Sequence, residues 1–96
     1  MIQIVADIGV NHSGNFHKAQ RLVDAAISIG VNSIKFQAWQ KDTFPDLSNL
    51  YMSYEELEKL FNECEKAKMD WFCTGFDLPT IKWLDDLGRK VFNICS

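Results

Sequence analysis

The sequence of 96 residues has few cysteines, and their spacing does not match a disulfide framework or a zinc site. Cys64, Cys73 and Cys95 are odd in number, and no two of them form a C-x-x-C pair. We therefore expect reduced, buried thiols of a cytosolic protein rather than disulfide-bonded or metal-binding residues.

Long hydrophobic runs and clusters of positive charge are also absent. No apolar segment approaches the roughly 20 residues that cross a bilayer, and the N-terminus lacks the basic start and apolar centre of a signal peptide. The formal net charge is −3 and there is no basic run, which argues against nucleic acid as a partner. We expect a cytoplasmic protein that binds neither nucleic acid nor a membrane.

The composition that remains is that of an ordinary globular domain. Hydrophobic residues make up 47% of the chain and charged residues 24%. This length allows one small domain with a modest core, so we expect a single domain over residues 1–96 and no second domain.

Four segments have the alternating or nearly continuous apolar character of β-strands. They are residues 2–8, 31–38, 71–76 and 90–95. In the first segment Ile2, Ile4, Ala6 and Ile8 are expected to pack under a helix. Helical patterns separate the strands, so the order β-α-β-α-β-α-β predicts an α/β fold with a parallel sheet and right-handed crossovers.

Apolar residues at i, i+3 and i+4 spacing predict helices over about residues 16–29, 53–67 and 79–88. The side chains expected to face the core are Phe16, Ala19, Leu22, Val23, Ala26, Ile27, Leu57, Leu60, Phe61, Cys64, Ile81, Trp83, Leu84 and Leu87. The residues suited to the helix ends are Asn15 or Ser13, Gly30, the capping-box pair Ser53 and Glu56, Pro79 and Gly88. A loop over 39–52 is long enough to cover a ligand, although its aromatic residues suit packing equally well.

Polar residues recur at or near the carboxyl ends of the expected strands. Asp7 belongs to the first strand, Lys35 and Gln37 to the second, Thr74 to the third and Asn93 to the fourth. Ligands of parallel α/β sheets and barrels bind at this edge. Asp7 alone could instead cap a loop, but the recurrence on successive strands favours a binding site whose ligand the pattern does not name.

These residues lie in motifs that resemble the N-terminal part of the sialic acid synthase family, which includes N-acetylneuraminate, legionaminate and pseudaminate synthases and spore-coat polysaccharide relatives. The family motifs AEIGxNHxG, KFQ, STPFD and FKIxS are similar to residues 6–14, 35–37, 73–77 and 92–96. The motifs occur in the same order, at the ends of successive strands, and together they span the chain.

The resemblance implies a (β/α)8 barrel, of which this chain would form the first half with four strands and three helices. It implies condensation of phosphoenolpyruvate with an N-acyl amino sugar such as N-acetylmannosamine, which releases phosphate and gives a nine-carbon acid. It also implies a divalent metal, manganese or magnesium, in the full-length family.

By motif match, Lys35 would hold the carboxylate or phosphate of phosphoenolpyruvate and Gln37 would orient it. Thr74 and Ser96 would add hydrogen bonds to the same anion, since a multiply charged enol phosphate needs cations and neutral donors. Asp7 would act near the reacting carbon or a metal-bound water, where a carboxylate can move a proton or steer water.

Three positions depart from the family pattern. Asp7 replaces a glutamate, which sets its carboxylate about 1.5 Å back on an unchanged backbone. Asn93 replaces a lysine of the substrate site, so it still donates hydrogen bonds but cannot neutralise a phosphate. Gly75 replaces a proline, which is expected to loosen the third loop.

The metal-binding histidines of the family lie in the second half of its barrel, so we expect no metal on this chain. His12 is expected to be a loop hydrogen-bonder and His17 an exposed residue of the first helix.

A complete barrel needs eight strands and about 250 residues. We therefore expect self-association or pairing with the second half of a barrel, and no activity from residues 1–96 alone. Three functions stay open: part of a sialic-acid-type synthase, an inactive truncated or degenerate relative with a residual anion site, and an aldolase with a Schiff base on Lys35. The last is least favoured, because a lysine beside Gln37 and Thr74 resembles an anion clamp.

Overall fold

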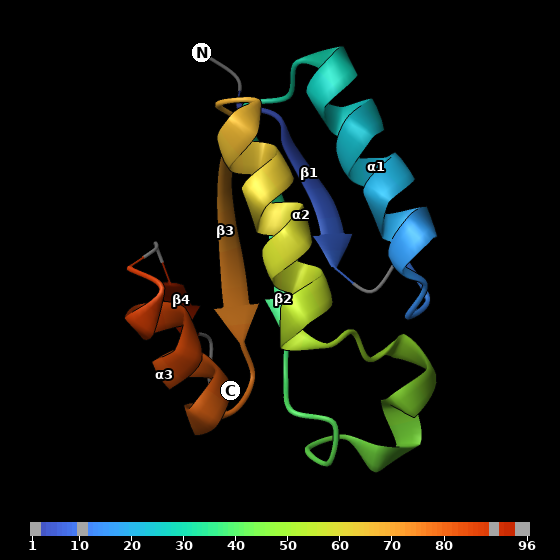
Figure 1. Ribbon diagram of the computed structural model, residues 1–96, viewed down its shortest axis with the longest axis vertical. Helices are drawn as coiled ribbons and strands as arrows, with labels where there is room; N and C mark the ends of the chain where they lie inside the picture. The colour runs from blue at the N-terminus through green and yellow to red at the C-terminus, as the bar shows by residue number, and fades with distance from the viewer. Residues whose placement is uncertain (1–2, 10–11, 89–90, 94–96) are drawn as a thin grey trace.

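The computed structural model describes residues 3–9, 12–88 and 91–93, and within these ranges four parallel strands form one sheet in the order β1-β2-β3-β4 (Figure 1). The strands are β1 (Val5–Gly9), β2 (Ser33–Ala38), β3 (Asp70–Gly75) and β4 (Val91–Asn93). The helices are α1 (Phe16–Ile29), α2 (Tyr54–Lys66), α3 (Leu78–Asp86) and the short 3-10 helix η1 (Pro45–Leu50). The predicted parallel βαβαβαβ order is confirmed.

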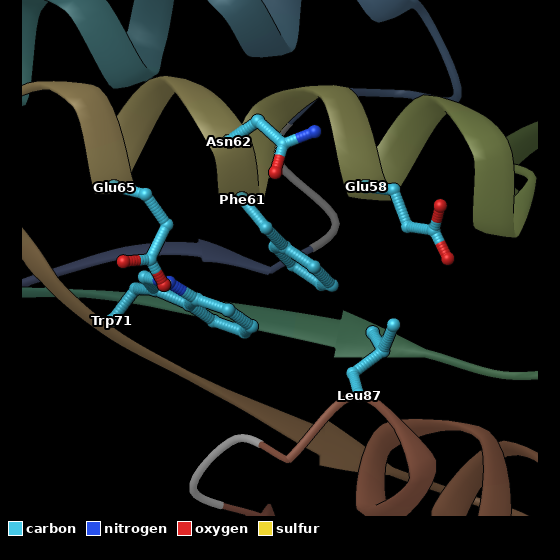
Figure 2. A pocket seen from close by; sticks show the side chains of 6 residues that line it. All are labelled: Glu58, Phe61, Asn62, Glu65, Trp71 and Leu87. Carbon is cyan, nitrogen blue, oxygen red and sulfur yellow. The ribbon is translucent and has the colours of Figure 1, made fainter.

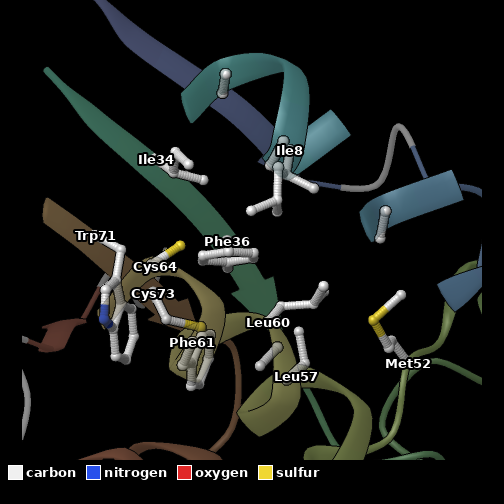
Figure 3. Close-up of a cluster of buried hydrophobic side chains, with 14 of the residues drawn as sticks. Ile8, Ile34, Phe36, Met52, Leu57, Leu60, Phe61, Cys64, Trp71 and Cys73 are labelled. Atoms are coloured by element: carbon white, nitrogen blue, oxygen red, sulfur yellow. The ribbon is translucent and has the colours of Figure 1, made fainter. Parts of the chain in front are cut away.

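The hydrophobic core lies between the sheet and the helices that cover one of its faces (Figure 3). Phe36 of β2 packs edge-on against both Phe61 of α2 and Trp71 of β3, and the last two rings stack with centroids 3.9 Å apart. The predicted inward residues of α2 are all buried: Leu57, Leu60, Phe61 and Cys64. Cys64 and Cys73 are both buried as expected, Cys73 is a free thiol, and Cys95 lies outside the described residues.

The helix ends confirm the predicted caps. The side chain of Asn15 accepts a hydrogen bond from the backbone N–H of Lys18, and Gly30 ends α1 in the left-handed conformation with φ of 82°. Ser53 and Glu56 form a reciprocal capping box at the start of α2.

Several element boundaries differ from those predicted. β1 begins at Val5 rather than at residue 2, and Ile4, expected under a helix, is 56% exposed. Backbone groups of Ile4 are instead hydrogen-bonded to Asn32, just before β2. β3 ends at Gly75 rather than at residue 76, and Leu87, expected in the core, is 38% exposed.

Residues 39–52, expected to be a loop, contain the helix η1. Pro45 occupies the first turn of η1, where a backbone N–H would have no hydrogen-bond partner within the helix, so the N–H that proline lacks is not needed. Six residues are too few to show a helical apolar period, so the sequence pattern could not reveal it. In the part of the chain that the structure describes, no helix is both long enough and apolar enough to cross a membrane.

Replacing Leu60 with alanine should lower the free energy of unfolding by about 2–5 kcal/mol, because Leu60 is fully buried and its loss leaves a cavity. Urea unfolding followed by circular dichroism measures the change. Leu78→Ala is the matched control, since Leu78 is 78% exposed and should change stability by about 0.5 kcal/mol or less. Equal effects of the two variants would contradict this description of the core.

Candidate functional site

The face of the sheet opposite the core, here called the inner face, carries the polar residues singled out from the sequence. Along β2, Ile34, Phe36 and Ala38 belong to the core. Side chains alternate along a strand, so Lys35 and Gln37 lie on the inner face. Trp71 and Cys73 of β3 belong to the core in the same way, which places Thr74 on the inner face.

The strand register arranges these residues in rows. Asp7 is the partner of Lys35, and Lys35 in turn pairs with Phe72. Gln37 pairs with Thr74 in the next row, toward the carboxyl ends of the strands. Lys35 and Thr74 therefore lie on one face of adjacent strands, one row apart, as the sequence predicted.

Gly9 brings Asp7 and Gln37 toward one point. The register of β1 with β2 shifts between Asp7 and Gly9, and Gly9 has a positive φ of 42°. A Cβ atom on Gly9 would lie 2.7 Å from Oδ1 of Asp7 and 3.4 Å from Nε2 of Gln37. The carboxylate and the amide converge over this glycine, and a side chain there would displace them. The role of Gly9 was missed from the sequence, where only its place in the first motif could have indicated it.

Thr74 supplies a buried hydroxyl on the same face. The residue is 2% exposed, and its Oγ1 has no hydrogen-bond partner among the described residues. Buried hydroxyls are normally hydrogen-bonded, so this atom is a candidate donor to a ligand.

The structure treats the two remaining predicted site residues differently. Asn93 is the last residue of β4. In the strand register it pairs with Gly75 of β3, the residue that follows Thr74 in the chain. Ser96 lies outside the described residues. Asp7, Lys35, Gln37 and Thr74 are thus brought together on one face.

His12 holds the loop between β1 and α1. Its Nδ1 accepts a hydrogen bond from the backbone N–H of Gly14 at 2.8 Å, and the ring is also hydrogen-bonded to the backbone of Gly9. Burial lowers the pKa of His12, so the ring is neutral near pH 7. The prediction of a loop hydrogen-bonder is confirmed, and His17 is exposed on α1 as expected.

The described residues do not fit a metal site. They contain no group of three or more His, Cys, Asp or Glu side chains that could hold an ion. The Nδ1 lone pair of His12 already accepts the Gly14 hydrogen bond.

Asp77, to which the sequence analysis gave no role, joins the long loop after β2 to α3. Its Oδ1 accepts the backbone N–H of Thr80 at 2.9 Å and caps α3. Its Oδ2 accepts the backbone N–H of Gln40 at 2.7 Å and the hydroxyl of Thr43 at 2.6 Å. Partial burial raises the pKa of Asp77, but the hydrogen bonds from Thr43, Thr80 and Gln40 outweigh it and hold the pKa below its ordinary value. The sequence did carry a signal for this cap, because an aspartate directly precedes the Leu-Pro that opens α3.

Aromatic rings continue the inner face beyond the polar rows. The rings of Trp39, Phe44 and Phe76 pack edge-to-face, with centroids 5.7–6.2 Å apart. With Gln37 and Leu47 they line a hollow of about 150 Å³, here called the edge pocket. The loop aromatics therefore pack on one another and also line a space beside Gln37.

A second hollow, of about 140 Å³, lies between α2, α3 and the start of β3 (Figure 2). Its two carboxylates each accept an indole N–H: Glu65 from Trp71 and Glu58 from Trp83, both at 3.1 Å. It lies on the helix side of the sheet, away from the inner face, so it does not contribute to the candidate site.

Comparison with known proteins agrees with the motifs. Residues 41–96 match the sequence profile of the NeuB family. The chain is 30% identical over 115 aligned positions to N,N'-diacetyllegionaminic acid synthase of Campylobacter jejuni, covering 97% of this chain and 34% of that protein. It is 44% identical over 112 positions to the spore coat polysaccharide biosynthesis protein SpsE of Bacillus subtilis, covering 97% of this chain and 30% of that protein.

A solved structure supports the fold. The N-acetylneuraminic acid (sialic acid) synthetase of Leptospira borgpetersenii, in complex with citrate, superposes with a TM-score of 0.79 and 25% identity over 94% of this chain and 35% of that one. This chain therefore spans about a third of the length of the relatives it matches. Its strands and helices form part of a sialic acid synthase-type barrel.

Replacing Asp77 with asparagine should lower stability near pH 7 by about 1 kcal/mol, because an amide nitrogen cannot accept the hydrogen bonds from Gln40 and Thr43. The pKa of Asp77 is lower in the folded protein than in the unfolded chain. The stabilisation by Asp77 is therefore complete above the unfolded pKa of about 3.9, and it disappears as the pH falls through the folded pKa. Thermal unfolding across acidic pH should show the two proteins converging. Asp24→Asn, at an exposed position of α1, is the control, and a difference that stays constant with pH would contradict this role.

Proposed function

This chain belongs to the NeuB family, and we propose that it is the N-terminal portion of a synthase that condenses phosphoenolpyruvate with an N-acyl amino sugar and releases phosphate. The observation that carries the proposal is the placement of Lys35, Gln37 and Thr74 on the inner face of adjacent strands, with Asp7 beside Lys35. Such a set of hydrogen-bond donors suits a small, highly charged ligand.

The anion would be held by three different donors. The ammonium group of Lys35 supplies a positive charge, which a phosphate or carboxylate needs for neutralisation. The Thr74 hydroxyl is buried and has no hydrogen-bond partner among the described residues. A hydrogen bond from this hydroxyl to the anion would therefore satisfy an otherwise unpaired group. The amide of Gln37, in the same row as Thr74, would orient the ligand between them.

Asp7 would serve the proton transfers of the reaction. In the condensation, C3 of the enol phosphate bonds to the carbonyl carbon of the sugar, whose oxygen takes up a proton. Water adds at C2 and gives up a proton, and phosphate departs from C2, which leaves the keto group of a nine-carbon acid. The Asp7 carboxylate converges with the Gln37 amide over Gly9, and there it could orient that water or accept its proton.

We place the divalent metal, manganese or magnesium, with ligands from the part of the relatives' length that this chain does not span. When bound, such an ion would polarise the sugar carbonyl. The described residues hold the anion and orient water without contributing a metal site.

We also propose that the inner face packs against the remaining strands of a barrel or against a second copy of the chain. Val5 on this face is 43% exposed, and an uncovered sheet face with open strand edges favours association. A cytoplasmic location is proposed because Cys73 is a free, buried thiol.

A catalytically inactive relative with a residual anion site is the second candidate. The observation that favours it is Asn93, an uncharged residue at the end of β4 where the family motif has lysine. Both candidates share the anion site and differ in turnover.

Lys35→Met should weaken the binding of phosphoenolpyruvate at least tenfold, because a hydrogen bond to a charged group contributes about 1.5–3 kcal/mol. Titration calorimetry, with ³¹P NMR to follow the phosphate, measures the affinity. Lys82→Met is the matched control, because Lys82 is exposed on α3, away from the inner face. Binding that Lys35→Met leaves unchanged would refute the anion site, and borohydride trapping of a carbonyl substrate on Lys35 would instead support a Schiff-base aldolase.

Residues 1–96 alone should not condense phosphoenolpyruvate with N-acetylmannosamine, with or without manganese, because the chain spans about a third of its relatives. Release of inorganic phosphate and chromatography of the acid product measure turnover. Turnover above background by this chain would overturn the expectation.

A further inference from the structure

We infer that His12 is a positioning residue: its ring fixes the backbone at Gly9, and this backbone determines how a carboxylate and an amide converge at the proposed anion site. The inference rests on the proposed function and extends it to a residue that does not face the ligand. His12 is 2% exposed, so the hydrogen bonds of its ring are made inside the protein.

The two ring nitrogens of His12 bridge the two ends of the loop between β1 and α1. Nδ1 accepts the backbone N–H of Gly14 at 2.8 Å. A neutral imidazole has one acceptor nitrogen and one N–H group, so the ring proton is on Nε2. The hydrogen bond between the ring and the backbone of Gly9 is therefore a donation from Nε2–H to the Gly9 carbonyl.

The Gly9 end of this bridge acts on the anion site. Gly9 has a φ of 42°, and Oδ1 of Asp7 and Nε2 of Gln37 both lie within 3.4 Å of the place where its Cβ would stand. Glycine adopts positive and negative φ about equally readily, so the residue alone does not select this conformation. The donation from His12 selects it, and with it the convergence of the carboxylate and the amide.

The Gly14 end gives the ring a fixed base. Gly14 has a φ of 71°, and a Cβ atom there would lie 2.5 Å from the carbonyl oxygen of Asn49 and 3.2 Å from that of Tyr51. The backbone of the first loop therefore packs directly against the segment that follows η1. His12 is attached to this packed segment through Gly14 while it holds Gly9.

Protonation of His12 would break the bridge, because a proton on Nδ1 would point at the N–H of Gly14 and oppose one donor to another. Burial lowers the pKa of the ring below its ordinary value of 6.5. The hydrogen bond to Gly9 and the carboxylate of Glu56 on α2 raise this pKa, whereas the ammonium group of Lys18 on α1 lowers it. The bridge is therefore complete above about pH 6.5 and is lost as the pH falls through the lower pKa of the folded protein.

Two substitutions each keep one half of the bridge. The amide nitrogen of His12→Gln takes the place of Nε2 and retains the donor to Gly9, whereas the amide oxygen of His12→Asn takes the place of Nδ1 and retains the acceptor for Gly14. At about pH 7.5, titration calorimetry with phosphoenolpyruvate should show affinity within about twofold of the unchanged protein for His12→Gln and about fivefold weaker for His12→Asn. A merely structural role would weaken both equally, because each variant loses one hydrogen bond. His17→Asn, at an exposed position of α1, is the control and should leave the affinity unchanged.

The pH profile gives a second readout. The affinity of the unchanged protein relative to His12→Gln should be constant above about pH 6.5 and should fall about fivefold as His12 becomes protonated. The titration of the phosphate group is common to both proteins and cancels in this ratio. A charged ring that attracted the anion directly would instead raise the ratio on acidification, which would overturn the inference.

NMR of the unchanged, ¹⁵N-labelled protein tests the bridge without any substitution. The amide signal of Gly14 should move with the same pH midpoint as the ring nitrogens of His12, and should not follow His17. A Gly14 signal that ignores the protonation of His12 would overturn the inference, even where a variant fails to fold.

The side-chain amide signal of Gln37 separates this inference from the proposal on which it rests. It should shift in His12→Asn and stay in place in His12→Gln, with or without phosphoenolpyruvate. If it does so but the anion does not bind, the positioning role is supported and the proposed anion site is wrong. If the anion binds through Lys35 and the two His12 variants bind it equally, the positioning role is wrong and the proposed function stands. If the anion does not bind and the two variants give the same Gln37 signal, both are wrong.

Discussion

The parallel pairing of β2 with β1 on one side and β3 on the other is the constraint on which the rest of the structure depends. It gives every residue of β2 a fixed partner, so Lys35 lies between Asp7 and Phe72, and Gln37 lies beside Thr74. The same alternation sends Ile34 and Phe36 into the core, where they join residues of α1 and α2 (Figure 3). A shift of one residue would exchange the two faces, which would bury the Lys35 ammonium and expose the core.

Two polar residues attach the loops at the carboxyl edge to this sheet. His12 connects the backbones of Gly9 and Gly14, and burial keeps its ring neutral by lowering its pKa. Asp77 connects α3 to Gln40 and Thr43, and its hydrogen bonds hold its pKa low despite partial burial. Both motif residues therefore stabilise loops around the proposed site. The edge pocket depends on Asp77, because the fastened loop supplies two of the pocket's aromatic rings.

The two hollows are similar in size but differ in the chemistry of the residues that line them. In the hollow between α2 and α3, Glu58 and Glu65 accept hydrogen bonds from tryptophan indoles, so these carboxylates help to order the helix layer (Figure 2). The edge pocket adjoins Gln37 and the row that holds the Thr74 hydroxyl, which has no hydrogen-bond partner among the described residues. Of the two, only the edge pocket combines apolar walls with neighbouring groups suited to a charged substrate.

The sequence by itself determined the order of elements, the core faces of α1 and α2 and the caps at Asn15, Gly30 and Ser53, because these follow from local periodicity and from hydrogen bonds within a few residues. It also indicated that Lys35, Gln37 and Thr74 share a rim, since all parallel strands end at the same edge. Only the tertiary structure decided that Asp7 converges with Gln37 over Gly9, that Asp77 fastens a loop some 34–37 residues away, and that Trp39 and Phe76 enclose a pocket. These arrangements depend on strand register and on contacts between distant segments, and no local pattern of residues encodes those distances.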